Sequence, residues 1–269
     1  MILLKNRGVI KIAGEDSLVF LNNLVTNEIT NANEENAVFA ALLSPQGKYL
    51  FDFFILKTGE NEFLLDCNHA DELAPRLNMF KLRAKVKIDN LSQEMAVFSG
   101  NFGNLTFQDP RNIDLGNRSF APIETKTNGS FDDYEKLRIE LGIPELSLDL
   151  LRDKDFVLEG LLDELNGVDF HKGCYTGQEM TSRMKRRGTI KQKLCRIDYI
   201  GEAPKFDTAI MASDLEIGRT RSMIEGTGIS LIRFDRWQDA QSQGHKLVAD
   251  NSEIIIRPPE WQNIILEAL

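Results

Sequence analysis

Three apolar runs separated by turn signals dominate the N-terminal part of the chain. Residues 37–44 form a continuous apolar run of strand length, and residues 48–57 and 62–67 form two more. The sequences SPQG at 44–47 and TGEN at 58–61 join these runs, and residues of this kind favour tight turns. Strands joined by tight turns pair with their neighbours, so these segments predict an antiparallel meander.

Helical periods and further strands surround the meander. Apolar residues at three- and four-residue spacing predict a helix over 18–25, with Asp16 or Ser17 as its cap, and a second helix over 69–81. Further elements are strands at 8–13, 86–88 and 95–98, loops around a weak strand or two at 99–130, and helices at 134–141, capped by Asp132 or Asp133, and at 159–165. Residues 1–190 therefore predict an α+β region of two subdomains, in which helices cover antiparallel sheets.

The pattern changes from Lys193 onward, where short apolar runs follow one another with turns between them. The runs cover residues 194–200, 208–212, 215–223, 228–234 and 252–257. Regularly spaced short strands are typical of a small barrel or sandwich. We expect a separate C-terminal β-barrel domain at residues 191–269.

The overall composition excludes several classes of protein. The 269 residues carry a net charge of −9, whereas a general nucleic-acid-binding protein needs a basic surface. No apolar run reaches the roughly 18 residues of a membrane helix, and the N-terminal segment MILLKNRGVIKIAG has no signal-peptide pattern. The motifs GxGxxG, GxxxxGK[ST], HExxH and GxSxG do not occur. We therefore expect a cytoplasmic protein without a membrane partner.

The three cysteines, Cys67, Cys174 and Cys195, are widely spaced. They form no CxxC pair and make no zinc pattern with the histidines, which we interpret as structural residues. Free thiols of this kind are typical of a reducing compartment. The sequence therefore predicts neither a disulfide framework nor a metal site.

Residues 172–179, with the sequence KGCYTGQE, concentrate reactive groups. Gly173 and Gly177 permit unusual backbone angles or the close approach of a ligand. We expect Thr176 to cap a helix that begins at 177, which places Cys174 just before a helix N-terminus and close to Lys172. Both the helix dipole and the ammonium group favour a thiolate. Cys174 is a candidate nucleophile, redox sensor or metal or cluster ligand, and the alternative is a small buried residue in a glycine-rich turn.

A basic segment follows directly. Seven cations occur within fourteen residues without an intervening acid, namely Arg183, Lys185, Arg186, Arg187, Lys191, Lys193 and Arg196. In a chain of net charge −9 this segment is a strong local asymmetry. It indicates either an anion site for a polyglutamate tail, a phosphate or an RNA backbone, or a solvated helix face that pairs with the acidic region 145–164.

Two carboxylates occur in notable positions. Asp52 lies inside the apolar strand sequence GKYLFDFFIL, and a buried carboxylate is unfavourable unless it is paired. Asp52 is therefore a candidate functional residue, although strand alternation also allows it to point to solvent. Glu140 lies near the end of a predicted helix, two residues after Arg138, and residues at this spacing do not share a helix face. A surface position is the simpler interpretation of Glu140.

The KGCYTGQE segment, followed by Arg183 and Arg187-Gly188, resembles the signature of the YgfZ family. These are folate-binding proteins of iron–sulfur cluster assembly and repair, related in fold to the glycine-cleavage T protein, an aminomethyltransferase. Further segments resemble the family's N-terminal helix at 20–27, its strand–turn–strand at 44–52, the LRxExGxP segment at 137–144 and, loosely, the IGxxTS hairpin of the barrel at 218–222. The resemblance implies a T-protein-like fold with a C-terminal β-barrel.

The resemblance also implies a site and a function. The implied ligand is tetrahydrofolate or a one-carbon derivative, and the implied role is the assembly or repair of iron–sulfur clusters. The residues that would bind folate are Asp52, Glu140, Tyr175, Gln178 and Arg183, and those that would carry chemistry are Cys174, Lys172 and Asp52. Implied partners are iron–sulfur client or assembly proteins, with an indirect link to tRNA through tRNA-modifying clients. The T protein lacks the cysteine, which disfavours aminomethyl transfer, and a folate-dependent one-carbon transferase of the aminomethyltransferase type is the alternative.

Overall fold

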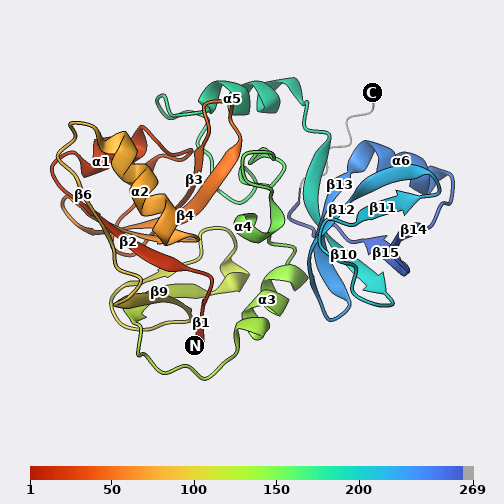
Figure 1. Cartoon of the computed structure of the whole chain (residues 1–269), viewed down its shortest axis with the longest axis horizontal. Helices are drawn as coiled ribbons and strands as arrows, with labels where there is room; N and C mark the ends of the chain where they lie inside the picture. The colour runs from red at the N-terminus through yellow and green to blue at the C-terminus, as the bar shows by residue number, and fades with distance from the viewer. Residues whose placement is uncertain (263–269) are drawn as a thin grey trace.

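The computed structural model describes residues 1–262 and contains two open antiparallel sheets and one closed barrel (Figure 1). The two open sheets and their helices form the N-terminal part of the chain, and the barrel forms the C-terminal part. This arrangement confirms the expected α+β fold with antiparallel sheets and a C-terminal β-barrel. No helix within residues 1–262 has the combined length and apolar character that a membrane span requires.

A five-stranded sheet contains the predicted meander. Its strands, in the order β3-β4-β5-β2-β6, are β2 (Gly8–Ala13), β3 (Val38–Leu43), β4 (Tyr49–Gly59), β5 (Glu62–Cys67) and β6 (Lys87–Asn90). Leu21 of α1 (Ser17–Asn22) and Leu73 of α2 (Ala70–Lys81) share one buried cluster with Ile10 and Phe53 of this sheet. Both helices therefore cover the same face, as their apolar spacing predicts.

A second, four-stranded sheet packs on the opposite face. Its strands, in the order β1-β7-β9-β8, are β1 (Ile2–Leu3), β7 (Met95–Ser99), β8 (Thr106–Gln108) and β9 (Asn117–Pro122). Phe39 and Phe54 of the first sheet share a buried cluster with Val97, Phe107 and Phe120 of the second. The core thus lies between two sheets stacked face to face. Two short 3-10 helices, η1 (Ile29–Asn31) and η2 (Ile113–Leu115), lie in the connecting loops.

One predicted helix is absent. Residues 159–165 form a series of turns, and Leu161 has a left-handed φ of 63° that a continuous helix does not allow. Leu158, Leu161, Leu162 and Leu165 are all buried. Because these side chains are buried in several directions, the backbone follows the surface of the core and does not form a helix with one buried face.

Two predicted helix caps are also wrong. Helix α3 (Phe131–Glu140) is capped by Ser130, whose hydroxyl accepts a hydrogen bond from the Asp133 N–H group, while the Asp133 carboxylate accepts one from the Ser130 N–H group. The aspartate thus completes a reciprocal capping box and is not the cap itself. Helix α5 (Gln178–Arg187) begins after Gly177, whose φ of 82° is left-handed, so Thr176 does not cap it.

The C-terminal strands close into a barrel and do not form a sandwich. The strands, in the order β10-β13-β12-β11-β14-β15, are β10 (Gln192–Ile200), β11 (Ala209–Ala212), β12 (Leu215–Ile224), β13 (Thr227–Arg233), β14 (Leu247–Ala249) and β15 (Ser252–Ile256). Helix α6 (Phe234–Ser242) and strand β14 extend the predicted pattern. Helix α6 was not predicted because most of its residues are polar, and its buried residues are Phe234 and Ala240.

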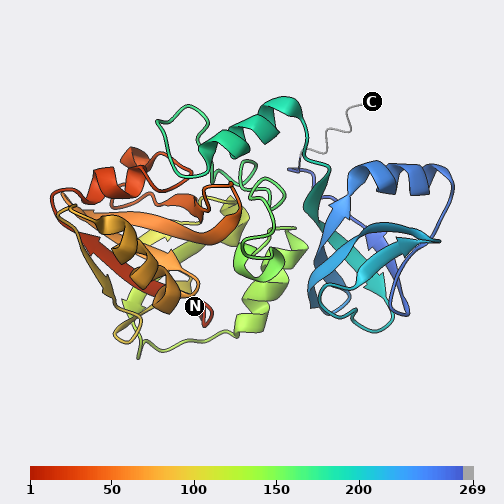
Figure 2. The ribbon, with the colours of Figure 1, turned by 45° about the horizontal axis from the view of Figure 1, so that its top comes forward.

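Helices α3, α4 and α5 lie where the N-terminal part meets the barrel, and α3 contacts β1 as well as β12 and β13. The short helix α4 (Leu146–Asp149) contacts both β4 and β12. Helix α5 runs along the outside of the molecule from the N-terminal part toward the barrel (Figures 1 and 2). The KGCYTGQE motif leads into α5 and contacts the N-terminal part, at residues 22–27 and at the turn between β3 and β4.

Candidate functional site

Lys172 is buried and anchors the motif to the N-terminal helix region. Its ammonium group donates hydrogen bonds to the backbone oxygens of Asn22, Val25 and Asn27 at 2.7, 2.8 and 2.7 Å. Burial lowers the pKa of Lys172 to about 8, and the three carbonyl oxygens match the three N–H donors of an ammonium group. The structure therefore places Lys172 as a clamp between the motif and residues 22–27, with its donors engaged.

Two glycines let the motif touch the turn between β3 and β4. Gly177 has a φ of 82°, and a Cβ atom there would lie 2.7 Å from the backbone oxygen of Ser44. Gly47 has a φ of 77°, and its Cβ atom would lie 2.9 Å from that of Met180. Only glycine tolerates both the backbone angle and the approach. The fold thus packs together two of the segments that carry the family resemblance.

Cys174 exposes its thiol, whereas Cys67 and Cys195 are buried. Burial raises the pKa of both buried thiols and makes them unreactive. The exposed position excludes the alternative in which Cys174 is a small core residue. It makes Cys174 the accessible thiol of this chain.

The residues around Cys174 hold its loop in place. Tyr175 is only 7% exposed, and its ring centroid lies 5.3 Å from the Lys172 ammonium nitrogen. Gln178 donates a hydrogen bond from its side chain to the backbone oxygen of Gly173 at 3.3 Å. Cys174 therefore lies on a short loop that is closed by Gln178 and flanked by buried side chains.

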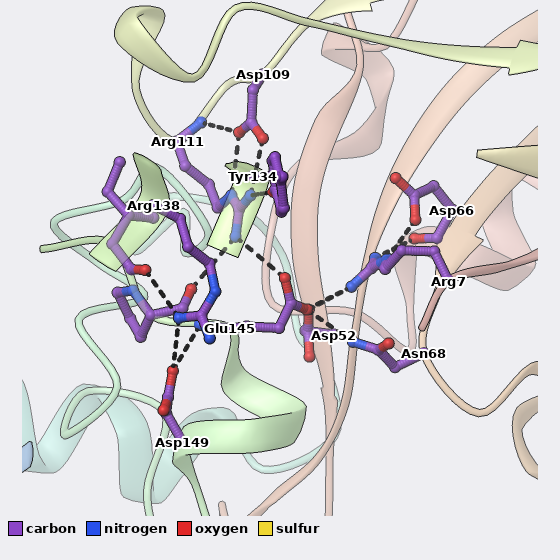
Figure 3. A network of polar contacts seen from close by, with 12 residues as sticks. Arg7, Asp52, Asp66, Asn68, Asp109, Arg111, Tyr134, Arg138, Glu145 and Asp149 are labelled. Atoms are coloured by element: carbon purple, nitrogen blue, oxygen red, sulfur yellow. Dashed lines mark hydrogen bonds and ion pairs between the residues drawn. The ribbon is translucent and has the colours of Figure 1, made fainter. Parts of the chain in front are cut away.

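A buried network of ion pairs fills the space between the two sheets and α4 (Figure 3). The guanidinium carbons of Arg7, Arg111 and Arg118 lie 5.3, 5.0 and 4.3 Å from the ring centroid of Phe54. Their acidic partners are Asp52, Asp66, Asp109 and Glu145. Charges buried this deeply are tolerated because each cation has opposite charges in direct contact.

Asp52 belongs to this network. It is 1% exposed, accepts a hydrogen bond from the Tyr49 hydroxyl at 2.7 Å and lies 3.4 Å from an Arg7 nitrogen. Burial and the neighbouring Glu145 raise the pKa of Asp52 more than Arg7 lowers it. The alternative of a solvent-facing Asp52 is wrong, because the first eight residues of β4 are buried on both faces of the sheet.

The structure separates Glu140 from this network. Glu140 is the last residue of α3 and is exposed, and its side chain forms no hydrogen bond or ion pair with residues 1–262. Glu145, five residues later, is 1% exposed and accepts hydrogen bonds from Arg7 and Asn68, both at 2.7 Å. Glu145 was not predicted from the sequence. Like Asp52, it has apolar neighbours, Pro144 and Leu146, and this signal could have identified it.

Asp149 extends the network to the barrel. Its Oδ2 atom accepts a hydrogen bond from Arg138 at 3.2 Å, and its Oδ1 atom accepts one from the backbone N–H group of Ser222 on β12 at 3.1 Å. Arg221 donates a further bond to the Asp149 backbone oxygen at 3.0 Å. Helix α4 is therefore bonded to both parts of the molecule, which fixes the barrel relative to the N-terminal sheets.

An open cavity of about 320 Å³ lies beside α4, between the two parts. Its wall includes Tyr49 of β4, His69 before α2, Leu148 of α4, Arg152, and Phe206 of the barrel. Tyr49 connects this wall to Asp52, since its hydroxyl donates to the Asp52 carboxylate. The cavity thus brings the exposed side chains of Leu148 and Phe206 close to the cation of Arg152.

The predicted folate-binding residues do not line this cavity. Asp52 is connected to the cavity wall through its hydrogen bond with Tyr49. Glu140, Tyr175, Gln178 and Arg183 lie outside the wall. Sequence analysis missed His69, Arg152 and Phe206, which come from three loops with no shared motif. No local signal identifies them, because only the docking of the barrel brings Phe206 to the other two.

The acid stability of the protein depends on Asp109. Burial alone would raise its pKa, but Arg111 and Arg118 outweigh burial and lower it to about 2. Because the folded pKa lies below the unfolded one, the ionised carboxylate stabilises the fold above about pH 4, and this contribution, on the order of 2 kcal/mol, is lost as the pH falls toward 2. We expect urea unfolding of the wild type to show this loss between about pH 5 and pH 2, and Asp109→Asn to show a smaller pH dependence. Equal pH dependence in both proteins would contradict the assignment.

Comparison with known proteins assigns both ends of the chain to domain families. Residues 4–100 match the model of the GCVT N-terminal domain, and residues 191–264 match that of the CAF17 C-terminal beta-barrel domain. The glycine cleavage system aminomethyltransferase T from Bartonella henselae superposes with a TM-score of 0.74 at 12% identity, over 96% of this chain and 84% of that one. The fold and the domain order define a GcvT-like protein with a CAF17-type barrel.

Individual relatives share the name iron-sulfur cluster assembly factor IBA57. The homologue from Neurospora crassa is 29% identical, over 76% of this chain and 55% of its own length. The homologue from Mycosarcoma maydis is 30% identical, over 72% and 56%, and that from Mus musculus is 28% identical, over 86% and 77%. The chain therefore spans about half the length of the two fungal relatives. All three relatives are named as mitochondrial, which contradicts the expectation of a cytoplasmic protein.

Proposed function

We propose that this chain is a tetrahydrofolate-binding protein that supports the assembly or repair of iron–sulfur clusters in client enzymes, tRNA-modifying enzymes among them. The exposed Cys174 on its clamped loop carries the proposal, because cysteine thiolates are the usual ligands of iron–sulfur clusters. The names of the relatives support the same function.

Cys174 would supply one ligand to a cluster that is cargo. Within residues 1–262 no three His, Cys, Asp or Glu side chains gather as a metal site. The other ligands of the cluster would therefore come from a second protein. The clamp formed by Lys172 and the buried ring of Tyr175 limit the freedom of the loop, which lowers the entropy that binding must overcome.

The residues around the cavity fit tetrahydrofolate. A volume of about 320 Å³ is at the lower end of small-molecule sites. The exposed Phe206 offers aromatic surface to a pterin ring, and Arg152, which pairs with the exposed Glu72, offers a guanidinium group to a glutamate carboxylate. Bound tetrahydrofolate would supply amine nitrogens that carry a one-carbon unit. Asp52 would act on the ligand indirectly, by holding the Tyr49 hydroxyl.

Removal of the Arg152 charge tests the folate site. We expect Arg152→Ala to weaken tetrahydrofolate binding about 10- to 100-fold in isothermal titration calorimetry, because one charge-assisted hydrogen bond contributes roughly 1.5–3 kcal/mol. Lys154 is an exposed cation two residues away and lies outside the cavity wall, so Lys154→Ala should bind tetrahydrofolate as the wild type does. Unchanged binding in Arg152→Ala, or no binding by the wild type, would contradict this site.

The cluster function is tested in cells that lack their own relative of this protein. Expression of the chain should restore the activity of an iron–sulfur enzyme in cell extracts. A wild-type chain that is soluble and abundant but restores no activity contradicts the proposal.

A further inference from the structure

Helix α5 divides the basic segment between two environments. Lys185 pairs with Asp163 at 2.7 Å, and Lys193 pairs with Glu164. The interpretation of the segment as a partner of the acidic region is thus confirmed for these two lysines. The remaining exposed cations form what we call the basic ridge, which consists of Arg183, Arg186, Arg187 and Lys191.

The basic ridge concentrates four exposed cations within nine residues. Some exposed lysines elsewhere lie against an acid, as in the pairs of Lys85 with Glu15 and Lys136 with Glu225, both 2.7 Å apart, and exposed cations without such a pair, such as Lys126 and Lys205, lie far apart in the sequence. The ridge residues form no ion pair with residues 1–262, although the whole chain has a net charge of −9. Clustered like charges without counter-charges destabilise a helix, so the ridge favours an external acidic partner.

The ridge and the exposed thiol belong to one continuous segment of the chain. Cys174 is four residues before the first residue of α5, and the two views show α5 along the outer edge of the molecule, between the N-terminal part and the barrel (Figures 1 and 2). Gly188 ends the helix with a left-handed φ of 59°, and Lys191 follows before the first barrel strand. A partner that contacts the ridge and extends along α5 toward its N-terminus would reach the loop of Cys174.

We propose that the basic ridge docks an acidic surface of the protein that exchanges a cluster with Cys174. This inference rests on the proposed cluster function and adds the chemistry of the partner. Three arginines suit carboxylates, since each guanidinium binds a carboxylate with two parallel hydrogen bonds. Such contacts fix the orientation of the partner and speed its association.

An acidic protein fits the ridge better than RNA does. The segment 178–191 contains no aromatic residue on which a base can stack. Four cations on a chain of net charge −9 also offer few phosphate contacts, and nucleic-acid affinity depends on their number. A carboxylate patch on a partner needs positive charge only where the two surfaces touch. At physiological salt, screening limits its repulsion by the acidic residues elsewhere on the chain to about 8 Å.

Protection of the Cys174 thiol tests the docking. Poly-L-glutamate serves as the acidic probe, and the readout is the rate at which a neutral maleimide labels Cys174, since Cys67 and Cys195 are buried. At low salt the probe should slow labelling about fivefold or more, and salt should remove the effect because the contact is electrostatic. The double variant Arg183→Glu/Arg187→Glu should lose the protection. Full protection in that variant would overturn the proposal.

Three controls separate the alternatives. The pair Arg76→Glu/Arg83→Glu on and after α2 gives the same change in net charge at exposed cations away from the ridge, and should keep both protection and cellular rescue.

The ridge variant should lose rescue but bind tetrahydrofolate pentaglutamate as the wild type does. Weakened folate binding would instead assign the ridge to the glutamate tail and overturn the proposal. Stronger protection by tRNA than by poly-L-glutamate would overturn it in favour of RNA. Loss of rescue in Cys174→Ser tests the cluster function separately, since that variant keeps the ridge.

Discussion

Replacing Cys174 by serine is expected to abolish the rescue of iron–sulfur enzyme activity while leaving the fold intact. A serine hydroxyl has nearly the same size as the thiol but does not form the thiolate that binds iron. Because Cys174 is exposed, the free energy of unfolding should change by less than about 0.5 kcal/mol. We expect rescue to fall about tenfold or more, the scale of damage to a metal site, in extracts assayed for a client enzyme.

A neighbouring variant provides the matched control. His171 is also exposed, lies three residues before Cys174 and uses only its backbone N–H group, which donates to Asp169. His171→Ala should therefore keep full rescue. Retained rescue in Cys174→Ser would show that the thiol has no part in the function and would remove the main support for the cluster proposal.

Replacing Arg7 by methionine is expected to destabilise the N-terminal part strongly. Arg7 contacts the carboxylates of Asp52, Asp66 and Glu145, and all four side chains are buried. Methionine fills part of the volume but leaves these carboxylates with less positive charge around them. Breaking a buried ion pair in this way costs about 3–5 kcal/mol, and urea unfolding measures the loss directly.

An exposed ion pair gives the comparison for Arg7. Lys136 and Glu225 lie 2.7 Å apart with side chains 46% and 67% exposed, so solvent screens their attraction. Lys136→Met should change the free energy of unfolding by less than about 1 kcal/mol. A loss of similar size in Arg7→Met would mean that the buried network contributes little to stability.

The network also explains why Asp52 is not a direct folate ligand in this proposal. Tyr49 and Arg7 already engage its carboxylate, and the residues around Phe54 are protein cations. A ligand that reached Asp52 would have to displace these contacts and leave charges unpaired, which is unfavourable in a buried site. The cavity beside α4 requires no buried ion pair to be broken, since Arg152 pairs there with Glu72, which is exposed to solvent.

Much of the fold follows from local sequence patterns. The runs at 37–44, 48–57 and 62–67 predict β3, β4 and β5 because their residues and turns favour strands whatever surrounds them. The prediction of a helix at 159–165 is wrong because the buried leucines there pack against several neighbouring segments at once. Helix α6 was not expected because it is short and mostly polar, with Phe234 and Ala240 as its buried residues.

The sequence by itself determined the α+β and barrel architecture, and it singled out the KGCYTGQE motif and Cys174 as candidates. These features depend on periodicity, turn residues and the reactivity of one side chain, all of which are local. The tertiary structure alone decided the roles of Lys172, Asp52 and Glu140. Whether a charge is a clamp, a buried partner or a surface group depends on which atoms meet it from distant segments, as the carbonyls of residues 22–27 meet Lys172. Charge compensation acts between such segments, so no local pattern records it.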